Sequence, residues 1–149
     1  MKVECKISEE HKEPYAVLYI NKMTEAIAQI ISMLEKENAG IPALTAVKNK
    51  RTYFIDTENI SLIRTEGRDI VCYDMQKNRY ILDKHLYELE SILDSGFVRV
   101  SKSAIVNIGQ IDHVEASFNG TMEIVMKNGL TDYISRNFRK SFKERLGLK

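Results

Sequence analysis

The stretch Phe97–Asn107 reads Phe-Val-Arg-Val-Ser-Lys-Ser-Ala-Ile-Val-Asn. Its first four residues alternate apolar and β-branched side chains with one arginine, which predicts a half-buried strand. The strand then stops at Ser101-Lys102-Ser103, two hydroxyl residues around one cation. Serine side chains can satisfy the backbone of a tight turn, so we expect a turn that leaves Lys102 exposed. Ala104-Ile105-Val106 returns to the core, and we interpret Asn107 as structural.

This stretch resembles the signature of the LytTR-type DNA-binding domains of bacterial transcription regulators, Phe-x-Arg-x-His-(Arg or Lys)-Ser-x-(Ile or Leu)-Val-Asn. Ser101 departs from it, because the family usually has His there. The matching residues are Phe97, Arg99, Lys102, Ser103, Ile105, Val106 and Asn107. The resemblance covers residues 44–148 and implies a β-rich α+β domain of several short antiparallel sheets with two helices, which binds duplex DNA.

Composition allows one moderate domain with a small extension. The chain has 149 residues and a net charge of +1, and no apolar run approaches the length of a membrane span. Acid near the start of the chain argues against a secretory signal, so we expect a cytoplasmic protein without direct membrane insertion. Cys5 and Cys72 show no paired spacing, which predicts two buried, reduced thiols rather than a disulfide or a zinc site.

The first forty residues predict a strand-strand-helix unit. Lys2–Ile7 and Tyr15–Ile20 have strand length, and helical spacing begins at Met23 with Asn21 or Thr24 as a candidate cap. Gly40 and Pro42 supply a stop, so we place a boundary there, with an extension at 1–40 and the main domain at 44–148. The extension could cover a sheet edge or make a dimer contact.

The rest of the chain alternates short strands with turns. Strands are expected at 45–47, 51–55, 60–65, 70–75, 79–82, 97–100, 104–106, 111–117, 121–126 and 130–134, with a helix at 84–93. Asn119-Gly120 and Asn128-Gly129 are strong hairpin signals. Ser135 is expected to cap a final helix that ends at Gly147.

Cations crowd the start of that final helix. Arg136, Arg139 and Lys140 lie near the positive end of the helix dipole, which is unfavourable by about 0.3–1 kcal/mol per exposed charge unless an anion binds. A solvated basic face is the simpler interpretation from charge alone. The resemblance favours DNA, because the family has a Ser-Arg pair here, matched by Ser135 and Arg136, and that arginine contacts DNA.

The resemblance also implies a set of DNA-binding residues in loops that enter successive major grooves. Lys102 lies in the matched signature, whereas Ser101 has a shorter reach than histidine and would make a weaker or water-mediated contact. The loop around Gly67 matches only by position. The full candidate set is Arg64, Arg68, Asp69, Ser101, Lys102, Arg136, Asn137, Arg139 and Lys140.

Other functions find less support in the residues. The three histidines have no metal-binding spacing, and no phosphate loop or nucleophile elbow is present, so we expect no enzyme, cofactor, metal or small-molecule substrate. The chain is acidic before Gly40 and basic after Ser135. We expect a homodimer on repeated half-sites of double-stranded DNA. The remaining alternative is a β-rich protein-protein interaction module that has lost DNA binding.

Overall fold

The computed structural model describes residues 2–8, 10, 15–35 and 41–148. The chain divides into two compact units, Met1–Glu35 and Lys36–Lys149. No helix in the described residues is long and apolar enough to cross a membrane.

The first unit contains one helix, α1, at Glu25–Glu35. The Thr24 hydroxyl caps it by accepting a hydrogen bond from the Ile27 amide at 3.2 Å. The prediction of strands at Lys2–Ile7 and Tyr15–Ile20 is wrong, because the structure has no strand at these residues. Side chains such as Ile7 and Tyr19 are almost fully exposed, and an isolated two-stranded ribbon without packing is marginal in water. The expected helix stop at Gly40 lies outside the described residues.

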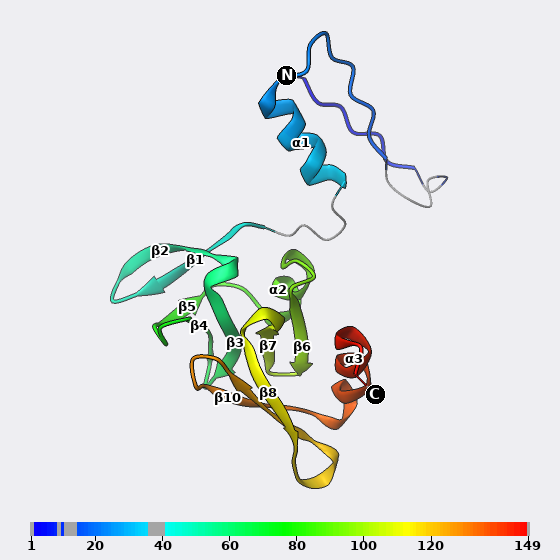
Figure 1. The fold of residues 1–149 in the computed structure, drawn as a ribbon. Helices are drawn as coiled ribbons and strands as arrows, with labels where there is room; N and C mark the ends of the chain where they lie inside the picture. Colours follow the sequence, from blue (N-terminus) through cyan, green and yellow to red (C-terminus); the bar gives the residue numbers. More distant parts are fainter. Residues whose placement is uncertain (1, 9, 11–14, 36–40, 149) are drawn as a thin grey trace. The chain divides into compact units, whose positions relative to one another are not determined.

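The second unit is built on a seven-stranded antiparallel sheet (Figure 1). Its strand order is β2-β1-β5-β4-β3-β7-β6. The strands are β1 (Ala43–Lys48), β2 (Arg51–Asp56), β3 (Ile60–Glu66), β4 (Asp69–Asp74), β5 (Arg79–Leu82), β6 (Phe97–Ser101) and β7 (Ala104–Asn107). The predicted fold class, β-rich α+β with antiparallel strands, is confirmed.

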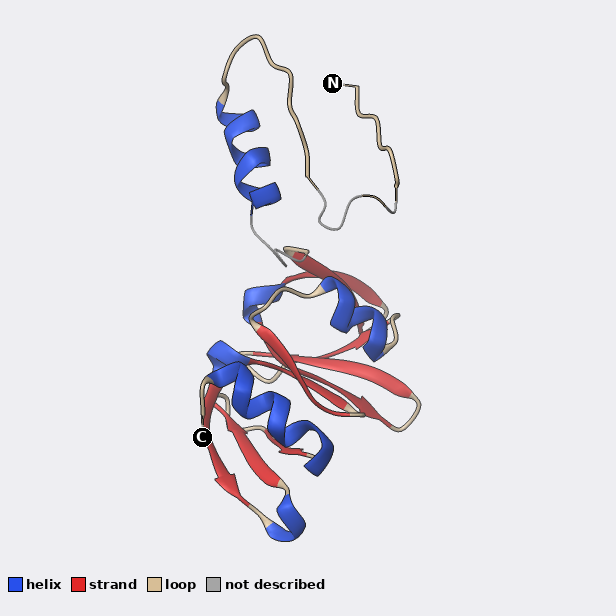
Figure 2. Cartoon of the chain, turned by 90° about the vertical axis from the view of Figure 1, so that its right-hand side faces the viewer, coloured by secondary structure: helices blue, strands red, loops and turns tan. Residues whose placement is uncertain are grey.

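The two faces of this sheet carry separate cores. Ile63 of β3 pairs with Ile105 of β7, and the neighbouring pair, Leu62 and Val106, points to the opposite face. Helix α2, Leu86–Ile92, covers the first face, where Leu89 is fully buried. Figure 2 shows helices on both sides of the large sheet.

A three-stranded sheet and the last helix cover the second face. The small sheet has the order β10-β9-β8, with β8 at Ile111–Ala116, β9 at Met122–Met126 and β10 at Thr131–Ile134. Helix α3, Arg136–Leu146, buries Phe142 in the same core as Ile124 and Leu62. The β8–β9 loop ends in Asn119 and Gly120, both at positive φ, as expected of an Asn-Gly turn.

The two cysteines differ. Cys72 is buried in the α2-side core, and burial raises the pKa of its thiol to about 12, whereas Cys5 is exposed. The expectation of two buried thiols is therefore wrong for Cys5, whose predicted strand does not form. Asn107 is structural as expected: its side chain amide donates to the Ile60 carbonyl at 2.9 Å and its oxygen accepts from the Gly109 amide.

Candidate nucleic-acid interface

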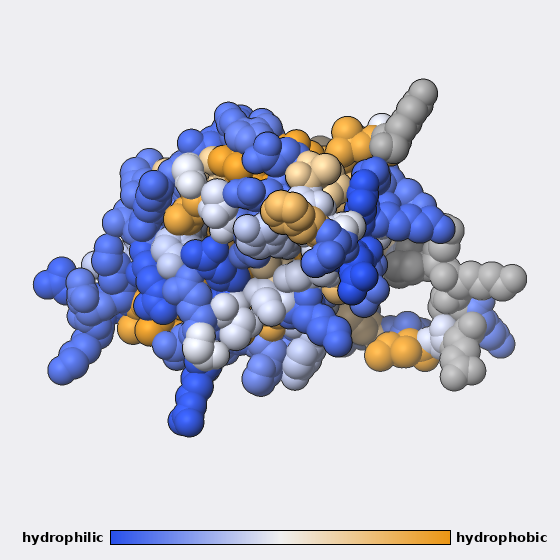
Figure 3. Space-filling model, turned by 90° about the horizontal axis from the view of Figure 1, so that it is seen from below, coloured by the Kyte–Doolittle hydropathy of each residue, from blue (hydrophilic) through white to orange (hydrophobic). Residues whose placement is uncertain are grey.

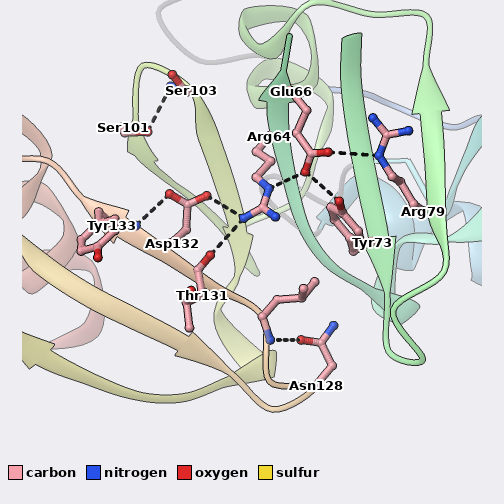
Figure 4. A network of polar contacts seen from close by, with 11 residues as sticks. Arg64, Glu66, Tyr73, Arg79, Ser101, Ser103, Asn128, Thr131, Asp132 and Tyr133 are labelled. Atoms are coloured by element: carbon pink, nitrogen blue, oxygen red, sulfur yellow. Dashed lines mark hydrogen bonds and ion pairs between the residues drawn. The ribbon is translucent and has the colours of Figure 1, made fainter.

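The β6–β7 turn has the architecture that its serines predict. The Ser101 hydroxyl accepts a hydrogen bond from the Ser103 amide at 3.0 Å, which closes the turn (Figure 4). Lys102 stands exposed between the two serines. After accepting this bond, the Ser101 hydroxyl can still offer a ligand its proton and its second lone pair.

Arg99 holds this turn from below, a role that the sequence reasoning missed. Its Nε donates to the Ser101 carbonyl at 2.7 Å, and its Nη2 donates to the Lys102 carbonyl at 2.6 Å. Its Nη1 makes an ion pair with Glu90 of α2 at 2.8 Å. An arginine on a half-buried strand just before a turn was the available signal, since its fork suits neighbouring acceptors.

The β3–β4 turn lies beside the β6–β7 turn. The Thr65 amide at the end of β3 donates to the Ser103 carbonyl at 2.9 Å. Gly67 takes a positive φ of +62° at the tip, which favours glycine, and Arg68 and Asp69 follow it, both exposed. The two loops therefore share one end of the large sheet.

The start of α3 is fixed on the other side of the same turn. The Ser135 amide donates to the Val100 carbonyl at 2.9 Å, one residue before the turn begins. Ser135 occupies the N-cap position, but its side chain makes no capping hydrogen bond, so the expected serine cap is wrong. The amide of Ser135 anchors the helix start to β6 instead. Arg136 and Asn137 follow, both exposed.

These bonds bring the two central cations together. Lys102 lies two residues after Val100, and Arg136 lies one residue after Ser135. Three trans-peptide steps of about 3.8 Å, added to the span of the Ser135–Val100 hydrogen bond, place the Lys102 and Arg136 Cα atoms within roughly 17 Å of each other. The ends of β3 and β6 and the start of α3 point toward the bottom of Figure 1. Figure 3 views this side directly and shows a mostly hydrophilic surface.

The β8–β9 loop supports the start of α3. The Arg139 guanidinium donates to the Gly120 carbonyl at 3.3 Å and is half-buried, while Lys140 is exposed. A Cβ added at Gly120 would lie 3.2 Å from both Cγ and Cδ of Arg136. The Arg136 side chain therefore lies against this loop.

Arg64 is placed differently from the other candidates. Its guanidinium donates to the Thr131 carbonyl at 3.0 Å, and it pairs with Asp132 at 3.4 Å and with Glu66 at 2.8 Å (Figure 4). It thereby joins β3 of the large sheet to β10 of the small sheet. Its side chain is only 24% exposed, so most of the group faces protein.

The acid in this network has a shifted pKa. Burial alone would raise the pKa of Glu66, but hydrogen bonds from Tyr73, Arg64 and Arg79 outweigh it and lower that pKa below its ordinary value. Burial alone would lower the pKa of Arg64, but its hydrogen bonds with Glu66 and Tyr73 and the negative charges of Asp132 and Glu66 outweigh this effect and raise that pKa. The network is charged at neutral pH and holds the two sheets together.

The remaining cations of the surface are free of carboxylates. Arg68, Lys102, Arg136 and Lys140 make no ion pair within residues 41–148. No group of three potential metal ligands is present in the described residues. Unpaired cations on adjacent loops of a rigid sheet attract an anionic polymer, and they define a domain of the nucleic-acid-binding class.

Comparison with known proteins agrees with this class. The family model for the LytTr DNA-binding domain matches residues 50–147. The chain belongs to the LytTr DNA-binding domain family. A solved LytTr DNA-binding domain from Bacillus cereus has the same fold, with a TM-score of 0.69 and 19% identity over 73% of this chain and all of that chain.

Two curated relatives differ in how much of their length this chain spans. An uncharacterized HTH-type transcriptional regulator of Staphylococcus aureus strain MRSA252 is 28% identical over 148 residues, 99% of both chains. The sensory transduction protein LytT of Enterococcus faecalis is 28% identical over 136 residues. That match covers 83% of this chain and 56% of LytT.

Proposed function

We propose that this protein is a sequence-specific transcription regulator that inserts loops of its sheets into successive major grooves of duplex DNA. The observation that carries the proposal is the pair of backbone bonds from Thr65 to Ser103 and from Ser135 to Val100. They hold the β3–β4 turn, the β6–β7 turn and the start of α3 side by side. The names of the relatives and of the family support a regulator that acts on DNA.

Each loop has a role suited to its side chain. Arg136 is the candidate for bidentate recognition of a guanine edge, because its fork is exposed at a helix start. Lys102, Arg68 and Lys140 neutralise phosphates, and Ser101 and Asn137 add hydrogen bonds. Asp69 would be repelled by phosphate, so its place in the set requires a base amino group as its partner.

Arg64 and Arg139 act through the scaffold in this proposal. Arg64 is engaged by Glu66, Asp132 and the Thr131 carbonyl, and Arg139 donates to the Gly120 carbonyl. We assign both to positioning the loops, and Arg139 can reach phosphate with the part of its fork that remains exposed.

A helix-turn-helix mode is disfavoured by the element order. Five strands separate α1 from α2, and a further five separate α2 from α3 in the described chain. No two helices are therefore joined by a short turn, and the exposed cations lie on loops and at one helix start. Recognition by loops fits this geometry.

The wider arrangement follows from the same proposal. The DNA-binding domain spans 44–148, the extension spans 1–40, and the protein acts in the cytoplasm as a homodimer on repeated half-sites. Two-fold symmetric proteins read half-sites on one face of the duplex when their spacing is about one helical turn or a multiple of it.

Selection from a random-sequence duplex pool tests the proposal. We expect the protein to enrich a defined motif, and Arg136→Ala to weaken binding to the selected duplex by roughly 1–3 kcal/mol in fluorescence anisotropy. Lys127→Ala is the control, because Lys127 is exposed at the start of the β9–β10 turn, at the opposite end of β10 from Ser135.

Failure would take a recognisable form. A folded protein that enriches no sequence, and that binds duplexes no better than Arg136→Ala does, contradicts the proposal. That outcome would favour the protein-protein interaction module, which the near-neutral net charge and Ser101 in place of the family histidine would then explain.

A further inference from the structure

The two edge strands of the seven-stranded sheet, β6 and β2, differ in how well they are protected from pairing with another strand. At the β6 edge, the Arg145 guanidinium of α3 donates to the Ser95 carbonyl at 2.5 Å and the Phe97 carbonyl at 3.3 Å. The Ser135 amide occupies the Val100 carbonyl. The β6 edge is thus closed by α3, which prevents pairing with another strand.

The edges of the small sheet are also protected. At β10, the Thr131 carbonyl accepts from Arg64. The β8 edge carries the exposed carboxylates of Asp112 and Glu115 and the exposed imidazole of His113. Charges along an edge strand disfavour pairing with a second chain.

The β2 edge has neither protection. Within residues 41–148, Arg51–Asp56 pairs with β1 alone, and β2 lies at the outer end of the sheet (Figure 1). Its middle residues, Thr52–Ile55, carry no charge, and Phe54 is 80% exposed. A groove lined by Phe54, Asp56, Asn59 and Gln76 runs beside the strand.

Apolar surface continues from this edge onto the sheet. Phe54 pairs with Thr45 of β1, and Val47 of the same strand pairs with Ile81 of β5. Because directly paired residues share a face, Phe54, Val47 and Ile81 lie on one face, and each is at least 38% exposed. An open edge beside an apolar patch indicates a surface that is covered in the working assembly.

We propose that β2 pairs antiparallel with β2 of a second copy of this chain. The charges at the two ends of β2 are the reason for choosing a second copy as the partner. Lys50 and Arg51 lie at the start of the strand, and Asp56 and Glu58 lie at and just beyond its end. An antiparallel copy brings the basic end of each strand beside the acidic end of the other, twice, whereas a parallel copy opposes like charges.

Two-fold symmetry limits the register. The axis runs perpendicular to the extended sheet, so each residue faces a partner residue from the same side of the sheet. Either Phe54 faces Phe54 of the second copy at the axis, or Tyr53 faces Tyr53. Both registers bury the exposed aromatic surface of β2 and extend each sheet to include the other.

This inference rests on the proposed function, because it assigns the interface of the proposed homodimer. The test of the interface requires no DNA. Sedimentation of the full chain should show a monomer–dimer equilibrium. Phe54→Lys should weaken dimerisation by at least about tenfold, because it places charge on the apolar strand. Tyr87→Lys is the control: Tyr87 is 67% exposed on α2, and this variant should dimerise like the wild type.

Charge reversal identifies the partner strand. In a homodimer, Arg51→Glu places an acid near Asp56 of the other copy at both ends of the paired strands, and Asp56→Lys places a base near Arg51 of the other copy in the same way, so each variant alone should dimerise weakly. An equimolar mixture should form heterodimers with restored affinity, since both end contacts become attractive. No other occupant of the edge predicts this recovery.

Three results would overturn the proposal. They are a wild type that remains monomeric at all concentrations, a Phe54→Lys variant that dimerises normally, and a mixture that shows no recovery. A strand of the chain's first residues on this edge would give the first result. DNA binding by monomeric Phe54→Lys to a single half-site would show that the proposed function stands independently.

Discussion

Arg99 shows how a residue that touches no ligand can determine a binding surface. Three of its guanidinium nitrogen atoms are used, two on the carbonyls of Ser101 and Lys102 and one on Glu90. The backbone that presents Lys102 is therefore fixed before any DNA arrives. Preorganisation of this kind lowers the entropy lost when the loop binds.

Arg99→Lys tests this role. A lysine ammonium cannot reproduce the planar fork, so we expect at least one carbonyl bond to be lost and DNA affinity to fall by roughly 1 kcal/mol in anisotropy titrations. Glu90→Gln is the matched control, because it removes the ion pair and leaves both carbonyl bonds in place. Equal losses in the two variants would contradict a specific role for the carbonyl contacts.

Glu66 makes the link between the sheets sensitive to acid. Its folded-state pKa is lowered from the ordinary value of 4.5. A carboxyl with a depressed pKa stabilises the fold above its unfolded pKa and loses this contribution as the pH falls through the folded value. Stability should therefore decline below about pH 4.5, in part through Glu66.

Glu66→Gln should reduce that acid sensitivity. The variant should be less stable than the wild type at neutral pH, because the charged acceptor for Arg64, Tyr73 and Arg79 is lost. The difference between the two proteins should narrow toward pH 3, measured by urea denaturation at each pH. A constant difference across this range would show that Glu66 does not couple to protonation.

At the scale of elements, strands with clear alternation and turn residues were predictable. Arg79–Leu82 was predicted at its observed bounds, and the other strands of the domain agree within about one or two residues. The Asn-Gly and Gly67 turns were also signalled by residue type. The period of two and the turn chemistry are local properties, so a single sequence carries them.

The predictions that were wrong concern features that depend on contacts with residues distant in the sequence. Tyr15–Ile20 has the composition of a strand, but strand formation requires a neighbouring strand, and the structure has no strand at these residues. The Ser135 cap failed for a related reason, since the anchor of α3 is the Val100 carbonyl on a distant strand. A residue pattern does not specify contacts of this range.

The β8–β9 loop sets the position of Arg136, and Gly120→Ala tests that. Gly120 has φ +76°, and an added Cβ would meet the Arg136 side chain at 3.2 Å. We expect Gly120→Ala to weaken DNA binding because both the loop and Arg136 must shift. Gly67→Ala has a similar positive φ with open space around it, so its effect should be confined to the β3–β4 turn.

At the scale of the molecule, the candidate residues were predictable but their grouping was not. The β3–β4 turn, the β6–β7 turn and the start of α3 are each more than thirty residues apart in sequence. The β3–β7 pairing and the packing of α3 on β6 bring them together. The same folding partly buries Arg64 among its carboxylate and carbonyl partners, which no local pattern indicated.

The low net charge of +1 is compatible with this surface because charge is distributed unevenly. Among residues 41–148, Arg68, Lys102 and Arg136 make no ion pair at their end of the fold, whereas Arg64 and Arg99 are paired with carboxylates. Binding to DNA depends on the local potential at the contact surface rather than on the total charge.

The dependence of DNA affinity on salt tests the central claim most directly. In the proposed complex, Lys102 and Arg136 contact one duplex. The slope of log K against log salt should become shallower by about 1 for each phosphate-contacting cation that is removed, and Lys102→Ala should show this change. Lys127→Ala should retain the slope of the wild type. Identical slopes for the wild type and Lys102→Ala would contradict the account, because Lys102 would then contact no phosphate.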